Sequence, residues 1–200
     1  MTLMTNTINE PLTLPSGLTL PNRLVKAAMT EGLADSRNRP TQQLTQLYSL
    51  WAAGGIGLQI TGNVQIDRRN LERPGNVVID GPVDAEMLDG LKAWATAAKS
   101  GGGACIVQLS HAGRQTPISV NDAPHAPSSV KLGLPGGQFG QPVEMTEADI
   151  HRVIANFANA ASVCRESGFD GVQIHAAHGY LISSFISPLS NTRVDDYGGS

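Results

Sequence analysis

The chain has 200 residues and a formal net charge of −3; 40% of its residues are hydrophobic and 16% are charged. This composition is ordinary for a globular protein with a sizeable core, and its slight acidity gives no reason to expect nucleic acid as a partner. No apolar run reaches the about 18 residues that a transmembrane helix needs, and the N-terminus lacks the basic run and apolar core of a signal peptide. We therefore expect a cytoplasmic protein without a membrane partner, in which Cys105 and Cys164 are buried thiols.

Short apolar runs alternate with segments of helical periodicity. In the segment from Thr41 to Gly54, apolar residues recur at the i, i+3, i+4, i+7 spacing of a helix. Thr146 and Asp149 form a capping box at the start of another helix. The expected elements are a hairpin over residues 12–20, strands over 24–29, 57–61, 104–109 and 169–175, and helices over 41–54, 84–99 and 146–168.

This order of elements predicts an α/β fold with a parallel sheet and right-handed crossovers. A doubly wound sheet and a TIM barrel both fit the pattern. A complete (βα)8 barrel usually needs about 250 residues and eight strands, and four strands are expected here. If the fold is a barrel, residues 1–200 are expected to form half of a single TIM-barrel domain, with the hairpin at its amino-terminal end. The loop over residues 111–144, rich in Pro, Gly and Ser, is typical of a lid or binding loop.

Polar residues gather at the carboxyl ends of the expected strands, where TIM barrels carry their functional groups. Thr30 follows the first strand, Asn63 the second, and Gln108 ends the third. His175 ends the fourth, and His178 and Tyr180 come directly after it.

The spacing of His175 and His178 would point both imidazoles the same way if the turn between them were helical. Two neighbouring donors can hold a carbonyl oxygen as negative charge develops on it. Tyr180 is a neutral phenol at pH 7 and can give up a proton. This combination indicates the reduction of a polarised double bond.

Two other chemistries fit less well. His111, His175 and His178 could form a zinc site, but no His-x-His pair occurs and Asp170 begins the fourth strand instead of ending it. Lys26 lies inside the first strand, where Schiff-base chemistry would need it at the strand end. We therefore expect no metal.

The run HAAHGYLISSFISPLSNTRVDDYGGS, from His175 to Ser200, closely resembles the active-site segment of old yellow enzyme-type NADH:flavin oxidoreductases. Further resemblances, in the family's order and over nearly the whole chain, are PNRLV at 21–25 leading to AMT at 28–30, WA at 51–52 followed by GGIGL at 54–58, and QLSHAGR at 108–114.

The resemblance implies that residues 1–200 are the N-terminal half of a single TIM-barrel domain, with FMN over the barrel mouth and NADH or NADPH as the reductant. It implies that hydride passes from the flavin to the β-carbon of a small enone-like substrate while Tyr180 protonates the α-carbon and His175 and His178 hold the carbonyl. For the flavin it implies contacts from the backbone of Ala27, Ala28 and Met29 and from Thr30, Asn63, Gln108 and His175, with Asn63 standing where the family usually has Gly or Ala.

The remaining residues of the matched segments are expected to have structural roles. His111 and Arg114 are expected to order the long loop, and Arg193, Asp195 and Tyr197 the segment after the fourth strand. Loops after strands seven and eight build the phosphate site of such barrels, so residues 1–200 alone are expected to bind FMN weakly or not at all. The alternative function is a non-catalytic half-barrel that pairs with a second copy as a homo-oligomeric assembly module.

Overall fold

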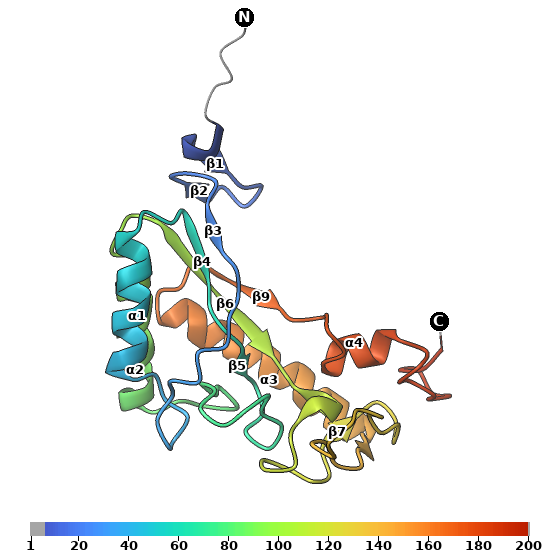
Figure 1. The fold of residues 1–200 in the computed structure, drawn as a ribbon. Helices are drawn as coiled ribbons and strands as arrows, with labels where there is room; N and C mark the ends of the chain where they lie inside the picture. The colour runs from blue at the N-terminus through green and yellow to red at the C-terminus, as the bar shows by residue number, and fades with distance from the viewer. Residues whose placement is uncertain (1–6, 200) are drawn as a thin grey trace, which may run out of the picture.

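The computed structural model describes residues 7–199, and its centre is a parallel sheet (Figure 1). Four strand lines lie side by side in chain order: β3 (Val25–Lys26), β4 (Leu58–Ile60), β6 (Ala104–Ser110) and β9 (Gly171–Ile174). β5 (Val64–Gln65) pairs with the same edge of β6 as β4 does, so β4 and β5 form one line that is interrupted at residues 61–63.

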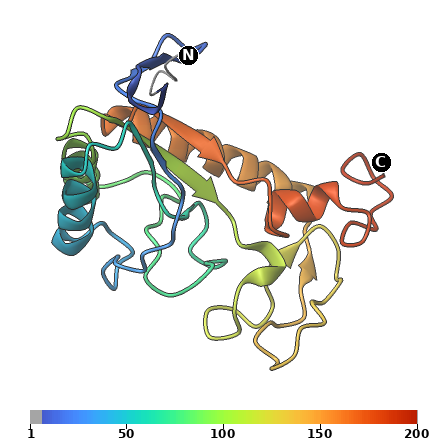
Figure 2. The same ribbon diagram turned by 45° about the horizontal axis from the view of Figure 1, so that its top comes forward.

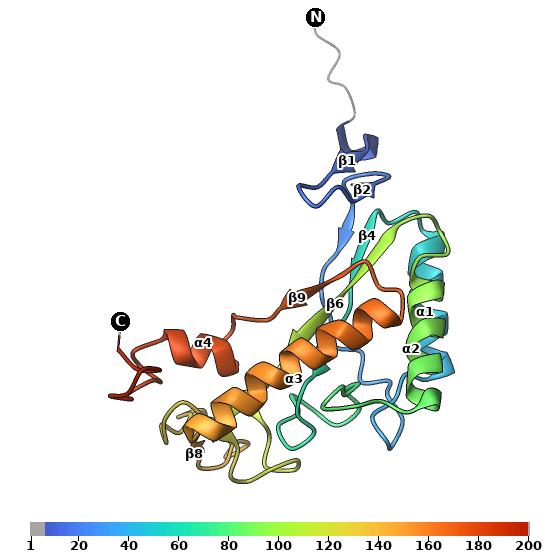
Figure 3. The same ribbon diagram turned by 180° about the vertical axis from the view of Figure 1, so that it is seen from behind.

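Three helices cover one face of this sheet, as Figures 1 and 3 show from opposite sides. They are α1 (Gln42–Ala53), α2 (Ala85–Ala98) and α3 (Glu147–Glu166). The side chains of Thr41 and Asp84 cap the first two, and Thr146 begins α3 with the predicted capping box. Sequential parallel strands with helices on one face are the first half of a (βα)8 barrel, whereas a doubly wound sheet has helices on both faces.

Side chains alternate across the sheet and divide the core in two. Cys105, Val107 and Leu109 of β6 pack toward the helices, in a cluster that includes Trp94 and Tyr48. Ala104 and Ile106 belong to a second, smaller cluster on the other face. This alternation turns Gln108 to the face that the helices leave open.

The predicted hairpin is present and packs against the amino ends of the strands. β1 (Leu12–Thr13) and β2 (Thr19–Leu20) pair in antiparallel fashion around a turn in which Gly17 has a φ of 86°. Leu14, Leu18 and Leu20 pack with Leu58 and Ala104, which begin β4 and β6. Figure 2 brings this end of the molecule forward. The chain therefore closes the amino-terminal end of the half-barrel with leucines.

The connections contain short elements that the sequence analysis did not predict. They are η1 (Thr7–Asn9), η2 (Gly113–Gln115), the parallel pair β7 (His125–Ala126) and β8 (Val143–Glu144), and α4 (Leu181–Ile186). Arg193 donates to the carbonyl oxygens of Pro127 at 2.9 Å and Met145 at 2.6 Å and pairs with Asp195, so it orders the segment after β9 as expected.

Three of the four predicted strands are shorter than expected because residues near their ends leave the ladder, whereas β6 is one residue longer. β3 ends at Lys26 instead of residue 29, and β9 ends at Ile174, one residue before His175. Cys105 and Cys164 are buried as expected, and burial raises the pKa of each thiol to about 12. Across residues 7–199, every helix is too short or too polar to span a bilayer.

Candidate active site

The ends of the four strand lines meet around a pocket of about 190 Å³. Every side chain predicted to act in catalysis lines this pocket. Ala27 and Met29 do not, but they flank Ala28, which does, and the prediction for them concerned backbone contacts only. The lining residues are Ala28, Thr30, Asn63, Glu72, Gln108, His175, His178 and Tyr180.

The two histidines converge, although the turn between them is not helical. His178 has a φ of 59°, which is left-handed backbone, and Gly179 follows with a φ of 75°. The rings of His175 and His178 nevertheless lie 5.3 Å apart, and those of His175 and Tyr180 lie 4.8 Å apart, both edge to face. A left-handed residue, and not a helix, therefore gathers the three side chains.

His175 is held as a hydrogen-bond donor. The backbone N–H of Ala177 donates to its Nδ1 at 3.3 Å, so in the neutral ring the proton is on Nε2. The side chain is buried, and this burial, together with the neighbouring His178, lowers the pKa of the imidazole. The neutral ring with a donating Nε2 is the form that suits carbonyl binding.

Tyr180 keeps its proton at neutral pH. It stands at the N-terminus of α4, where it is half-buried. Burial raises the pKa of its phenol, and the nearby Glu72 adds to that shift. A protonated phenol beside two imidazoles can serve as an acid in this pocket.

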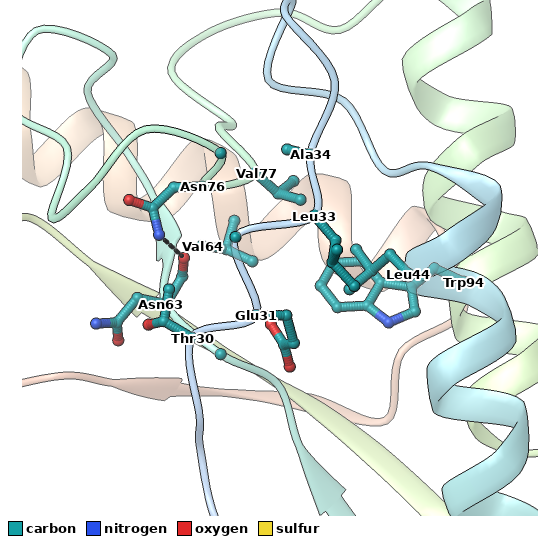
Figure 4. Close-up of a pocket in the computed structure, with 13 residues that line it drawn as sticks. Thr30, Glu31, Leu33, Ala34, Leu44, Asn63, Val64, Asn76, Val77 and Trp94 are labelled. Carbon is teal, nitrogen blue, oxygen red and sulfur yellow. Dashed lines mark hydrogen bonds between the residues drawn. The ribbon is translucent and has the colours of Figure 1, made fainter.

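Glu72 is the lining residue that the sequence analysis missed. Its Oε2 accepts from the hydroxyl of Thr30 at 2.7 Å and from the amide of Asn63 at 2.9 Å. Asn76 fixes the loop that carries Glu72: its Oδ1 accepts from the backbone N–H of Arg73 at 2.9 Å, and its Nδ2 donates to the backbone oxygen of Asn63 at 3.2 Å (Figure 4). The turn residues Pro74-Gly75 were the only signal near this position.

Asn63 and Gln108 present amide groups to the pocket. Glu72 accommodates the Asn63 side chain where the family usually has a smaller residue, and the Oδ1 of Asn63 is buried without a partner among the described residues. Gln108 extends from β6 and donates to Gln173 at 2.6 Å. The two side chains together offer both hydrogen-bond donors and acceptors.

Gly62 permits the close approach of the first two strand ends. A Cβ at this position would lie 2.3 Å from the carbonyl oxygen of Met29 and 2.8 Å from the Cα of Thr30. We expect Gly62→Ala to reduce the free energy of unfolding by about 1–3 kcal/mol because the backbone at residues 29–30 must shift. Urea denaturation measures this, with Gly81→Ala as the control because nothing lies within 4 Å of its Cβ position. Equal stabilities of the two variants would contradict the expectation.

His111 and Lys26, on which the two alternative chemistries depended, lie outside the pocket. His111 is buried, and its Nδ1 accepts from the backbone N–H of Gly113 at 3.0 Å. Arg114 donates to the carbonyl oxygen of Val130, so both residues order the long loop. Residues 7–199 contain no group of three or more His, Cys, Asp or Glu placed to hold a metal ion. Lys26 packs against Trp51 of α1, with its Nζ 4.5 Å from the ring centroid, outside the pocket.

Comparisons with known proteins identify the family of the chain. The sequence model of the NADH:flavin oxidoreductase / NADH oxidase family matches residues 7–200. The chain belongs to this family. It is 41% identical over 205 residues to the NADH-dependent flavin oxidoreductase iliE of Hypocrea jecorina, a match that covers 95% of this chain and 51% of that protein. The chain therefore spans about half the length of this curated relative.

Solved structures of old yellow enzyme homologues have the same fold. The homologue from Zymomonas mobilis matches with a TM-score of 0.85 at 29% identity, covering 97% of this chain and 55% of that one. Morphinone reductase in complex with tetrahydroNAD matches with a TM-score of 0.83 at 26% identity, covering 98% and 56%. The described residues thus form about the first four βα units of a TIM barrel, with four strand lines and three covering helices, preceded by a hairpin. Old yellow enzymes use FMN with NAD(P)H.

The residues of the pocket fit one edge of a flavin. Ala28 leaves room for a flat ring, Gln108 carries a donor and an acceptor for a pyrimidine edge, and the buried Oδ1 of Asn63 lacks a partner within residues 7–199. The hydroxyl of Thr30 donates to Glu72, which leaves its oxygen able to accept. The donor set of this chain therefore suits the ring of FMN.

Proposed function

We propose that the protein containing this chain is an FMN-dependent oxidoreductase that uses NADH or NADPH and reduces the activated C=C bond of small α,β-unsaturated carbonyl compounds. The observation that carries this proposal is the grouping of two imidazoles and a phenol, with ring centroids 5.3 Å and 4.8 Å apart, at the strand ends of a half-barrel. Membership in the flavin oxidoreductase family supports it.

The chain's own residues would bind and protonate the substrate. His175 and His178 hold the carbonyl oxygen, where negative charge develops, and the Ala177 contact keeps His175 in its donating form. Tyr180 keeps a proton on its phenol oxygen for the α-carbon. FMN, when bound, supplies the hydride. Gln108, Asn63, Thr30 and the backbone around Ala28 would orient the flavin ring.

We propose that residues 1–200 form the N-terminal half of a single barrel domain that supplies the substrate side of the site. The loops that bind phosphate in such barrels follow strands seven and eight, and the described strands are the first four. The relatives' greater length supports this division.

His175→Ala tests the proposal in the FMN-loaded gene product that contains this chain. The wild type should reduce 2-cyclohexenone with NADH or NADPH, and it should bind phenols through the two histidines. The variant should bind phenols at least about tenfold more weakly, because the hydrogen bond from the His175 imidazole to the charged oxygen of the phenol ligand is lost. His151→Ala, on the exposed surface of α3, is the control. The proposal would be contradicted if the wild type did not reduce the enone, or if His175→Ala and His151→Ala bound phenols equally well.

A further inference from the structure

The backbone at His178 is held by a side chain from another loop. His178 has a φ of 59°, and for a residue other than glycine this left-handed backbone persists only where the surrounding structure holds it. Gln115 supplies such a contact, because its Nε2 donates to the backbone carbonyl oxygen of His178 at 2.5 Å. The loop after β6 therefore fixes the loop after β9 at the residue that carries one of the two imidazoles.

The peptide group between His178 and Gly179 is bonded at both of its polar atoms. Gln115 donates to its carbonyl oxygen, and its N–H donates to the hydroxyl oxygen of Ser183 at 3.2 Å. Gly179 leaves the room that this arrangement needs, since a Cβ there would lie 2.7 Å from the Nε2 of Gln115. The peptide group cannot rotate out of the left-handed turn without losing both hydrogen bonds.

Gln115 is itself fixed by its place at the end of η2. Its backbone N–H donates to the carbonyl oxygen of Ala112 at 3.1 Å, and the Nδ1 of His111 accepts from the N–H of Gly113 at 3.0 Å. The carbonyl oxygen of His111 accepts from the N–H of Leu181 at 3.0 Å, which ties the start of α4 to the same loop. These contacts join the ends of β6 and β9, which are neighbours in the sheet.

The two histidines of the site are thus held in different ways. His175 is held through its ring, because its Nδ1 accepts from the N–H of Ala177. His178 is held through its backbone, by Gln115, which is not among the residues that line the pocket. A hydrogen bond from an imidazole needs about 2.7–3.2 Å between donor and acceptor, so a shift of about 1 Å in the ring would weaken or break it.

We propose that Gln115 is a positioning residue of this site: its bond to the carbonyl oxygen of His178 keeps that imidazole where it can hold a ligand oxygen beside His175. The inference rests on the proposed function, since it takes the two histidines as the groups that bind the substrate oxygen. Loss of the Gln115 amide should release His178. It should leave His175 in place, because His175 has its own contact with Ala177.

Gln115→Met removes the donor and keeps a side chain of similar length. Calorimetric titration of the FMN-loaded gene product should give this variant at least about threefold weaker binding of 4-hydroxybenzaldehyde, a phenol. In a His178→Ala background, the same substitution should change the affinity by less than about 1.5-fold, because the imidazole through which Gln115 acts is absent. A general distortion of the pocket would instead weaken binding in both backgrounds.

Gln141→Met is the matched control for the loss of a glutamine amide. The Nε2 of Gln141 donates to the carbonyl oxygen of Ser129 in the same long loop, away from the pocket. This variant should bind the phenol as the wild type does. A second test variant, Gln115→Glu, keeps the shape of the side chain. Its ionised carboxylate can accept but cannot donate, so it should also weaken binding at pH 7.

Two results would overturn the proposal alone while His178→Ala still weakens phenol binding. One is wild-type affinity in Gln115→Met or Gln115→Glu, and the other is an equal loss of affinity in the wild-type and His178→Ala backgrounds. Failure of the proposed function would look different. If His178→Ala bound the phenol as tightly as the wild type, the role of this histidine in holding the ligand would be contradicted, and the role of Gln115 with it.

Discussion

Tyr180→Phe should leave the reduction of the flavin by NAD(P)H unchanged and slow hydride transfer to an enone by about 10²–10⁴-fold. Phenylalanine keeps a ring beside His175, 4.8 Å away in the wild type, so the pocket should retain its shape. Only the hydroxyl that would protonate the α-carbon is lost. The effect is therefore expected in the half-reaction that needs a proton, and the other half-reaction acts as an internal control.

The pH dependence of the same step follows from the environment of Tyr180. Burial and Glu72 raise the pKa of the phenol above its ordinary value of about 10. A raised pKa favours the protonated form, so the wild-type rate of enone reduction should stay level up to about pH 10 and fall only at higher pH. The fall should be absent in Tyr180→Phe, which has no proton to lose.

Stopped-flow absorbance of the flavin measures the two half-reactions separately. Tyr197→Phe is the matched control, because Tyr197 lies in the segment after α4 and its hydroxyl contacts His151 at 2.9 Å, outside the pocket. It should keep both rates. Equal enone reduction by Tyr180→Phe and the wild type would remove Tyr180 from the proposed proton transfer.

Residues 1–200 produced alone should fail to retain FMN and should aggregate or dimerise. Among the described strands, β3 and β9 each have one unpaired edge, and such edges pair readily with other chains. Val25 on β3 and Ile174 on β9 are exposed to 49% and 45%. An apolar groove of about 360 Å³ between α3 and α4 adds Ile154 and Ile186 to this exposed surface.

Light scattering after gel filtration and the flavin absorbance of the eluted protein test this expectation together. FMN incubated with the chain should separate from it on the column, because the half that builds the phosphate site of such barrels is not among these strands. A yellow, monomeric preparation would contradict both parts of the prediction. An oligomer that retains FMN would contradict the part on cofactor binding and favour pairing of half-barrels.

Helices could be predicted from the sequence because their signals are local. Thr146 and Asp149 lie three residues apart in the chain, so the capping box is visible before any tertiary contact is known. The spacing of Leu44 and Tyr48 likewise places them on the buried face of α1. The parallel order of the strands followed from the alternation of elements, and the resemblance to a family distinguished the barrel from the doubly wound sheet.

The rest of the site depends on contacts between segments far apart in the chain. In the pocket, the carboxylate of Glu72 accepts a hydrogen bond from Thr30, which lies 42 residues earlier in the chain. No periodicity in the sequence marks such a distant pair. The backbone of His178 is left-handed, a conformation that glycine usually adopts. A histidine at this position therefore does not predict it. The residues at which β3 and β9 end depend on how far each strand pairs with its neighbour, which is a contact between distant segments.

The leucine hairpin at the amino-terminal end has a consequence for protein engineering. Because Leu14, Leu18 and Leu20 seal that end while the pocket opens at the other, stability and selectivity are encoded in separate parts of the chain. Libraries that randomise the connections after β5 and β9 can therefore explore new selectivities on an unchanged scaffold. Directed evolution should tolerate far more variation there than among the hairpin leucines.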